Sequence, residues 1–207
     1  MSGGLLIFAV DIELSGCRID KDNIVAIGWC AIKATTGDTV DQGCVSLEPI
    51  PGRRLFEERC LKEFWSKNEA LLKEFRRTAM TPMGGIANFF ATLDILDKEY
   101  DVRIVTDNPC SDIAWIDYYG GRFLDRNPMC YRLNTSEWRP VYDTDSYARA
   151  AAKVPYRNAY TDNKGVISSL GIDAKSVPEA THHPTEDARA IAILHRLVYL
   201  AATAESE

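Results

Sequence analysis

The stretch of sequence that decides the fold covers residues 5–16 and reads LLIFAVDIELSG. Its first six residues, Leu5 to Val10, are continuously apolar, as expected of a short strand that is buried on both faces of a sheet. Asp11 and Glu13 follow at the carboxyl end of this strand. Side chains two residues apart in a strand point to the same face, so we expect the two carboxylates to project together.

Two neighbouring carboxylates at the end of a buried strand need compensation for their charge. They repel each other, and their removal from water adds a further cost, which a bound cation relieves. A site whose ligands are all oxygen atoms favours Mg²⁺ or Mn²⁺ over zinc. Asp11 and Glu13 are therefore candidate metal ligands; the alternative is a strand that simply ends in acidic residues as it leaves the core.

The segments that follow this strand predict an α/β layer fold. Further strands are predicted over residues 24–34, 38–47 and 102–106. Predicted helices cover residues 57–78, 83–100, 112–120, 143–152, 163–170 and 184–201. Three strands followed by helices that alternate with further strand are typical of α/β layers, not of a helix bundle or a β-sandwich. Without an internal repeat or a linker, residues 1–207 are predicted to form a single domain.

Composition and charge narrow the class of protein. Hydrophobic residues make up 46% and charged residues 26% of the 207 residues, which fits a globular domain and excludes a disordered or collagen-like chain. Lys and Arg number 24 against 30 Asp and Glu, a net charge of −6. This balance argues against a surface that binds nucleic acid or anionic membranes over its whole extent. A small basic track, or a site where metal ions supply positive charge, stays compatible with it.

The same sequence predicts a cytoplasmic protein. No apolar run approaches the roughly 18 residues that a membrane-spanning helix needs, and no basic segment precedes Leu5 to Val10, so we expect neither a signal peptide nor membrane attachment. The six cysteines are widely spaced, without a Cys-x-x-Cys pair or a Cys/His cluster. This spacing disfavours a structural zinc site and a disulfide framework, and reduced thiols are expected.

A third candidate carboxylate lies in residues 106–112, TDNPCSD, directly after the apolar segment 102–105. The expected order is strand, tight turn and helix, with Ser111 as the helix N-cap. Asp112 then sits in the first helical turn, where the helix dipole favours a negative charge and where a purely structural role is common. It shares a helix face with Trp115, which we expect to be buried against the sheet.

A fourth candidate lies in residues 181–190, THHPTEDARA. Pro184 suits the first position of the last helix, which leaves His182 and His183 on the loop that enters it. Asp187 heads an apolar stripe of that helix, so we expect its carboxylate to point at the sheet and to need a partner there. A histidine on this loop could act as a general base near neutral pH.

These residues are compatible with a single site. Four carboxylates can hold two cations roughly 3.5–4 Å apart, the arrangement used for in-line attack on phosphodiesters. One cation would ionise a water molecule, the other would stabilise the leaving oxygen, and the histidine would take the proton of the water.

In their order and spacing, the motifs resemble those of the DEDD superfamily of 3′–5′ exonucleases, in the branch with a catalytic histidine. Residues 11–16 are similar to the family's Asp-x-Glu followed by a hydroxyl residue and Gly, and residues 108–112 to its Asn-x-x-x-Asp. His182 and Asp187 have the His-x-x-x-x-Asp spacing. The resemblance covers residue 5 to about residue 200.

The resemblance implies a ribonuclease-H-like fold, with a five-stranded mixed sheet whose first three strands are antiparallel and with helices on both sides. It also implies two Mg²⁺ or Mn²⁺ ions in each active site. The implied roles are metal ligands for Asp11, Glu13 and Asp187, metal ligand directly or through water for Asp112, and general base for His182.

Two of the implied roles, the third carboxylate and the histidine, each have an alternative residue nearby in the sequence. Asp107 competes with Asp112 for the role of the third carboxylate, although the spacing and the helix start favour Asp112. His183 competes with His182, although the five-residue step to Asp187 selects His182. No tyrosine stands at either histidine position, which disfavours the tyrosine-bearing branch of the family.

A single strand of nucleic acid needs stacking surfaces and phosphate contacts near the site. Residues 122–157 carry seven basic against four acidic side chains, with aromatic residues between them, which suits such a strand; the alternative is an ordinary solvated surface. Predicted substrate contacts, of which the resemblance suggests the first for the terminal base, are Leu14, Asn108, Trp115, Tyr131 and Arg132.

The leading hypothesis is a two-metal-ion 3′–5′ exonuclease that acts on single-stranded 3′ ends and releases nucleoside 5′-monophosphates. The compact layout without an obvious polymerase-binding tail slightly favours RNA or short oligonucleotides over DNA. The resemblance also makes a homodimer one of the assemblies to test. The alternative of a different class is an inactive exonuclease-like domain that binds nucleic acid or a protein, against which the intact set of carboxylates argues.

Overall fold

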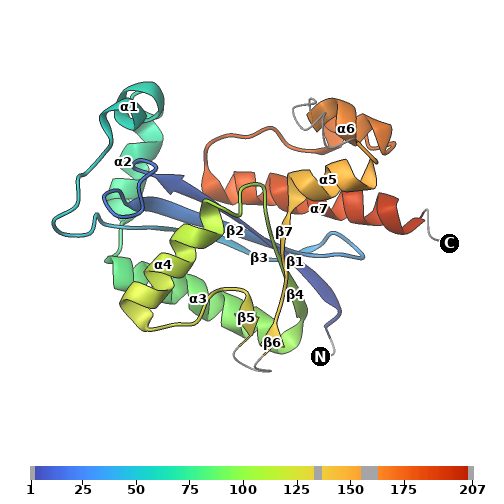
Figure 1. Cartoon of the computed structure of the whole chain (residues 1–207), viewed down its shortest axis with the longest axis horizontal. Helices are drawn as coiled ribbons and strands as arrows, with labels where there is room; N and C mark the ends of the chain where they lie inside the picture. Colours follow the sequence, from blue (N-terminus) through green and yellow to red (C-terminus); the bar gives the residue numbers. More distant parts are fainter. Residues whose placement is uncertain (1–2, 133–136, 155–162, 205–207) are drawn as a thin grey trace.

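A mixed five-stranded sheet forms the centre of the molecule (Figure 1). The structure is a computed structural model, which describes residues 3–132, 137–154 and 163–204. Its strands are β1 (Leu5–Leu14), β2 (Ile24–Lys33), β3 (Thr39–Ser46), β4 (Asp101–Thr106) and β7 (Val141–Asp143). They lie in the order β3-β2-β1-β4-β7. Because β1 to β3 are antiparallel while β4 runs parallel to both β1 and β7, the expected mixed sheet is confirmed.

The helices lie close to their predicted positions, with one exception. Their bounds are α1 (Glu58–Cys60), the π-helical turn η1 (Leu61–Trp65), α2 (Glu69–Thr78), α3 (Pro82–Glu99), α4 (Asp112–Leu124), α5 (Thr144–Ala151), α6 (Asn163–Ser169), the 3₁₀ turn η3 (Ala174–Ser176) and α7 (Pro184–Ala204). A separate hairpin pairs β5 (Tyr131–Arg132) with β6 (Glu137–Trp138).

The exception is the helix predicted over residues 57–78, which is divided into α1, η1 and α2. Two polar side chains at the break bond to backbone carbonyls of the preceding turn. The Ser66 hydroxyl donates to the carbonyl of Lys62 at 2.6 Å, and the Asn68 amide donates to that of Phe64 at 3.1 Å. The prediction of a single helix was therefore wrong, and the break places two aromatic residues of η1 at the edge of the site described below.

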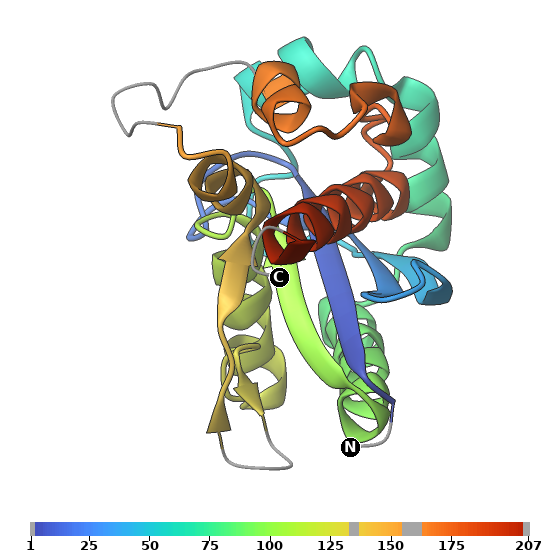
Figure 2. The ribbon, with the colours of Figure 1, turned by 90° about the vertical axis from the view of Figure 1, so that its right-hand side faces the viewer.

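Alternate residues of β1 face two different helical layers. Leu6, Phe8 and Val10 pack into the main core with α3 and α4. Ile7 and Ala9 pack instead against α7, which crosses the other face of the sheet (Figure 2). Because side chains alternate along a strand, Asp11 and Glu13 belong to the α7 face.

Gly28 allows α7 to approach this face closely. It pairs with Asp11 in the register of β1 and β2. A Cβ atom at this position would lie 2.1 Å from the carbonyl carbon of Pro184 and 2.3 Å from the amide nitrogen of Thr185. The first turn of α7 is further held to β3 by the Thr185 hydroxyl, which donates to the carbonyl of Gly43 at 2.8 Å. The start of α7 is thus pressed onto the sheet beside Asp11.

No helix in the described part of the chain combines the length and the apolar character that crossing a membrane requires. All six cysteines are free thiols, and they range from buried, as Cys30, to exposed, as Cys17 and Cys110. Burial raises the pKa of the Cys30 thiol to about 11, which keeps this thiol protonated at neutral pH.

Candidate active site

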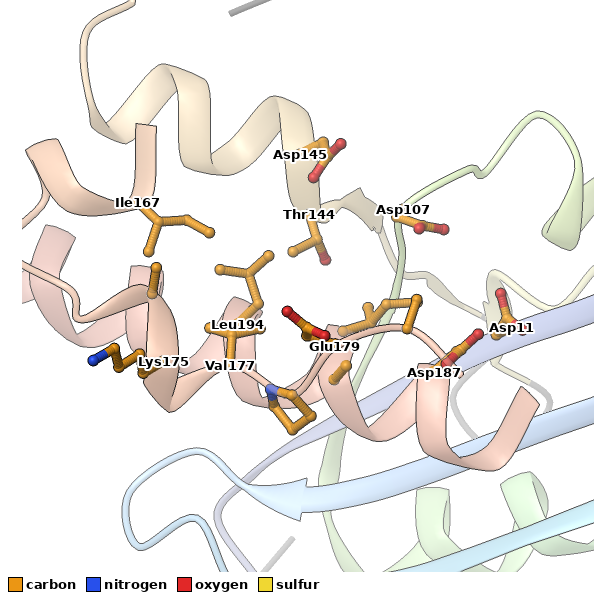
Figure 3. Close-up of a pocket in the computed structure, with 15 residues that line it drawn as sticks. Asp11, Asp107, Thr144, Asp145, Ile167, Lys175, Val177, Glu179, Asp187 and Leu194 are labelled. Carbon is orange, nitrogen blue, oxygen red and sulfur yellow. The ribbon is translucent and has the colours of Figure 1, made fainter. Parts of the chain in front are cut away.

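Five acidic side chains meet where β1 and β4 end and α7 begins. Asp11 and Glu13 come from the end of β1, and Asp107 follows β4. Asp112 is the first residue of α4, and Asp187 lies in the first turn of α7. Figure 3 shows the carboxylates of Asp11, Asp107 and Asp187 bordering one cavity.

The possible metal-binding atoms of these residues fall into two clusters. In the first cluster, one carboxylate oxygen from each of Asp11, Asp107 and Asp112 lies within 4.8 Å of the others. In the second cluster, the ligand atoms of Glu13, His182 and Asp187 meet the same limit. The structure therefore brings together the four carboxylates and the histidine that the sequence predicts, and adds Asp107 to them.

Burial and mutual repulsion make the charged state of these carboxylates costly. Burial, followed by the negative charges of Asp112 and Glu13, raises the pKa of Asp11 to about 9. Burial and the carboxylate of Asp187 raise the pKa of Glu13 to about 8, and burial raises that of Asp112 to about 7. Carboxylates with such raised pKa values are typical of a site that receives positive charge from outside the chain.

Asp112 is 4% exposed and is fixed by the turn that precedes it. Its carboxylate accepts a short hydrogen bond from the hydroxyl of Thr106, the last residue of β4. The carbonyl of Asn108 accepts from the backbone amides of Ser111 and Asp112, each at 2.9 Å, and so closes the turn. Ser111 occupies the predicted N-cap position, but its side chain makes no capping bond, so the expectation that its hydroxyl caps α4 was wrong.

The loop that carries the histidines supplies hydrogen-bond donors to the inward-facing carboxylate of Asp187. Its Oδ1 accepts from the backbone amide of Thr181 at 2.7 Å, and its Oδ2 accepts from the backbone amide of His182 at 3.0 Å. The same carboxylate is thus a candidate ligand and a clamp on the loop. His182 adopts the left-handed conformation with φ +63°, which is strained for a residue other than glycine.

The two loop histidines point to different surroundings. His182 is exposed and reaches the cluster with Glu13 and Asp187. The ring of His183 packs instead against Phe75 of α2, with ring centroids 5.8 Å apart, and its Nδ1 is buried. His195 lies 5% exposed within α7, where burial lowers its pKa to about 4. The geometry places His182, not His183, beside the carboxylates.

Two aromatic residues of η1 also reach this end of β1. Phe64 packs its ring edge to face with that of His182, with centroids 5.0 Å apart. Trp65 is fully buried, and its indole Nε1 donates to the carbonyl of Leu14 at 3.0 Å. The sequence does not mark Phe64 as a site residue, because only the π-helical turn brings it beside His182.

A cavity of about 940 Å³ extends from the carboxylates along α7. Near the carboxylates it is lined by Asp11, Asp107 and Asp187, and further along by Asp145 and Glu179 (Figure 3). Its far end combines apolar side chains of α6 and α7, such as Ile167 and Leu194, with the cationic side chain of Lys175 (Figure 3). A volume of this size holds a small organic ligand, and the acidic mouth suits cations next to it.

Three of the predicted substrate-contact residues, Leu14, Asn108 and Trp115, belong to the segments that carry the carboxylates, with different exposure. Leu14 is half-buried directly after Glu13, and Asn108 is exposed beside Asp107. Trp115 is 4% exposed and packs in the core between the sheet and α4. Its expected burial is confirmed, but this burial leaves no ring face for a base, so we do not retain Trp115 as a substrate contact.

The other two, Tyr131 and Arg132, lie at the opposite end of the sheet (Figures 1 and 2). Both belong to β5, whose hairpin precedes β7, whereas the carboxylates follow the carboxyl ends of the parallel strands. Tyr131 packs edge to face on Trp138 of the same hairpin, with ring centroids 5.2 Å apart. The side chain of Arg132 lies outside the described residues. Their backbone therefore lies away from the carboxylates, and their contact with substrate stays a prediction.

Two arginines of the basic segment 122–157 are used within the molecule. Arg139 is 5% exposed and bonds to Asp97 at 2.5 Å, and Arg126 bonds to Asp94 at 2.5 Å. Both carboxylates belong to α3. Residues 133–136 and 155–162, which include Arg157, lie outside the described residues. Arg126 and Arg139 therefore pair with α3 and are not available for a track at the site.

The fold is shared with solved nuclease structures. The nuclease domain of 3′hExo, a DEDDh family member bound to rAMP, matches with a TM-score of 0.62 and 14% identity, over 92% of this chain and 90% of that one. The chain has the fold of the DEDDh exonucleases. E. coli exonuclease I in complex with a dT13 oligonucleotide matches with a TM-score of 0.66 and 13% identity, over 100% of this chain and 43% of that one.

A third example of this DEDDh-like fold is cell-death related nuclease 4, which matches with a TM-score of 0.61 and 17% identity, over 97% of this chain and 66% of that one. No protein-family model and no curated protein sequence matches the chain. The chain thus covers most of the length of the 3′hExo nuclease domain but less than half of the length of exonuclease I. At these identities the likeness concerns the fold, and the reaction has to be argued from the site.

Proposed function

We propose that the chain is a metal-dependent 3′–5′ exonuclease that shortens single-stranded nucleic acid from its 3′ end and releases nucleoside 5′-monophosphates. The observation that carries this proposal is the meeting of Asp11, Glu13, Asp112, Asp187 and His182 at one edge of a DEDDh-like sheet. Two of the fold neighbours are described with a nucleotide or an oligonucleotide bound, rAMP and dT13, which supports the same class of ligand for this cavity.

The donor set fits two divalent cations, Mg²⁺ or Mn²⁺. All carboxylate donors are hard oxygen atoms, and the raised pKa values of Asp11, Glu13 and Asp112 reflect burial together with negative charge that the chain itself does not neutralise. Asp11, Asp107 and Asp112 would hold one cation, and Glu13 and Asp187 the other. When bound, the cations supply an activated water molecule and stabilise the charge that develops on the phosphodiester oxygens.

The residues of the chain then account for orientation and proton transfer. The imidazole of His182 would take the proton of the attacking water, since it stands with Glu13 and Asp187 at the open side of the site. Asp187 holds the loop of His182 through the two backbone amides at 2.7 and 3.0 Å. Attack on phosphorus breaks its bond to the 3′ oxygen of the shortened strand, so the released nucleotide keeps its 5′-phosphate.

The test uses matched single-stranded RNA and DNA carrying a label at the 5′ end. With Mg²⁺ or Mn²⁺ we expect a ladder of shortened products, faster on RNA, and the nucleoside 5′-monophosphate as the released product. Asp11→Asn and His182→Ala are expected to lower the rate by at least about 100-fold, as removal of a metal ligand or a general base does. His183→Ala and Asp20→Asn serve as matched controls, because His183 packs on Phe75 and Asp20 pairs with Arg18 at the surface.

Each outcome of this experiment has a defined meaning. A ladder that chelation abolishes, with full activity in both controls, supports the proposal. Intact ends on every RNA and DNA under metal would overturn it, and retained binding of the labelled strand would then favour the inactive binding module. If His183→Ala loses more activity than His182→Ala, the assignment of the general base is wrong.

A further inference from the structure

An aromatic side chain that neither the motifs nor the metal clusters include supports the histidine of the proposed site. Phe64 stands on the π-helical turn η1, and its ring meets the His182 ring edge to face, with centroids 5.0 Å apart and an interplanar angle of 84°. We propose that Phe64 is a positioning residue, whose ring fixes the orientation of the His182 imidazole toward the carboxylates. This inference rests on the proposed exonuclease function, which gives His182 its role.

His182 needs such support because its own loop provides little. The residue is exposed and has φ +63°, and its backbone amide is tied to Asp187. Its imidazole contacts the ring of Phe64. Among residues 3–132, 137–154 and 163–204, the imidazole makes no hydrogen bond to another side chain. A histidine held only by its backbone can rotate about its side-chain bonds, and each orientation away from the water lowers the rate.

Phe64 itself is held firmly from behind. Its ring packs edge to face on Trp65, with centroids 4.9 Å apart and an interplanar angle of 84°. Trp65 is fully buried and donates to the carbonyl of Leu14 at 3.0 Å, the residue directly after Glu13. A continuous path of contacts thus runs from the end of β1 through Trp65 and Phe64 to His182. It fixes the histidine relative to the same strand that carries two of the candidate metal ligands.

The π-helical turn is the local feature that makes this path. The backbone amide of Ser66 donates to the carbonyl of Leu61 at 2.8 Å, five residues earlier. This wider turn carries two successive aromatic residues, one directed into the core and one toward His182. Such turns are rare in proteins, and many of those that occur lie at functional sites. This agrees with a role for Phe64 beyond packing.

The chain offers a matched control in Phe56. This residue is half-buried, as Phe64 is, and its ring packs edge to face on Trp65 with centroids 5.9 Å apart. Its recorded ring and cation contacts are with Trp65 and Arg76, and none is with His182. Phe56→Leu and Phe64→Leu therefore remove similar rings from the same aromatic cluster, and only the second removes the contact with the histidine.

The first readout is nuclear magnetic resonance of the imidazole groups, which does not depend on activity or on metal. The chain has three histidines, and His182→Ala identifies the signals of His182. We expect Phe64→Leu to shift the ring signals of His182 and to leave those of His195 in place. Phe56→Leu is expected to leave both unshifted, and Phe64→Tyr, which keeps an aromatic ring, is expected to restore the wild-type positions.

The second readout separates binding from catalysis on a labelled strand. Phe64→Leu is expected to lower kcat by about tenfold or more with KM within about twofold, because the histidine acts in the chemical step. Phe56→Leu is expected to keep kcat within about twofold, and Phe64→Tyr to recover most of the wild-type kcat. If Phe64→Leu does not fold, Phe64→Met replaces it.

The outcomes distinguish this inference from the proposed function. Unshifted His182 signals in Phe64→Leu, or equal kcat values for Phe64→Leu and Phe56→Leu, overturn the positioning role while the exonuclease activity of the wild type stands. A wild-type protein without metal-dependent activity overturns the proposed function, and the imidazole spectra still decide whether Phe64 orients His182.

Discussion

Asp107 shows how a single residue changes the description of the site. The sequence presents Asp107 and Asp112 as alternatives, yet ligand atoms of both lie within 4.8 Å of that of Asp11. The hydroxyl of Thr106 already bonds to one oxygen of Asp112. A cation at this cluster therefore competes with this hydrogen bond for the carboxylate of Asp112, and Asp107 supplies a further charged donor. The spacing of the two residues in the sequence cannot show that both reach the cluster, because the tight turn between them brings their carboxylates close together.

Asp107→Asn is expected to weaken the binding of Mn²⁺. The loss of a charged donor should lower the affinity by at least about tenfold, the lower bound for losing even an outer partner of a metal site. Isothermal titration calorimetry with Mn²⁺ measures the change. Asp145→Asn is the matched control, since Asp145 lines the same cavity but belongs to neither cluster, and its affinity should stay near that of the wild type. Equal affinities for the two variants would show that Asp107 is a bystander.

At the scale of elements, the site depends on how closely α7 approaches β2. Gly28→Ala places a Cβ atom 2.1 Å from the carbonyl carbon of Pro184, so either the helix start or the strand has to move. We expect a loss of about 1–3 kcal/mol in the free energy of unfolding, as for other overpacked positions. Because Asp187 lies on the displaced turn, we also expect weaker Mn²⁺ binding. Denaturant unfolding and metal titration measure the two effects.

Gly165→Ala is the control for this prediction. Gly165 lies in α6, and a Cβ atom there meets nothing within 4 Å. In a helix, alanine is favoured over glycine, so this variant should be unchanged or slightly more stable, with wild-type metal affinity. The packing argument fails if Gly28→Ala also keeps both wild-type stability and wild-type affinity.

The elements differ in how far the sequence predicts them. The strand of Leu5 to Val10 and the common direction of Asp11 and Glu13 follow from its apolar run and from alternation, and the packing of Ile7 and Ala9 on α7 confirms both. The strand β7 has three residues, which is too short for any periodicity to mark. The division of residues 57–78 coincides with side-chain bonds of Ser66 and Asn68 to the backbone, which helix propensity does not contain.

At the scale of the whole molecule, the charge of one sequence segment does not predict the charge at the site. Residues 122–157 combine a positive charge with aromatic rings, but two of their arginines, Arg126 and Arg139, pair with Asp94 and Asp97 of α3. The site itself gathers acidic groups from β1, β4, α4 and α7, which are spread over most of the chain. Five of the acidic residues behind the net charge of −6 thus meet at the site, where divalent cations would reverse the local sign.

This distribution predicts how the stability of the metal-free protein depends on pH. Burial raises the pKa of Asp11 from 3.8 to about 9 and that of Glu13 from 4.5 to about 8, so above pH 4 the folded state holds protons that the unfolded chain releases. When the folded state binds more protons, the free energy of unfolding falls as the pH rises, until the folded pKa values are passed. His195, whose pKa burial lowers from 6.5 to about 4, acts in the opposite direction, but only below about pH 7.

Between about pH 7 and about pH 8.5, we therefore expect the free energy of unfolding of the metal-free protein to fall by more than about 1 kcal/mol. Chemical denaturation in the presence of a chelator measures it. The raised pKa values of Cys30 and Cys44 give a slope of the same sign, so Asp11→Asn is the control that isolates the site, and its slope should be smaller. Mn²⁺ holds the carboxylates ionised in the folded state, so its stabilising effect should be larger at the higher pH and its binding should release protons. A wild-type slope equal to that of Asp11→Asn, together with Mn²⁺ binding that releases no protons, would contradict a buried carboxylate cluster that awaits cations.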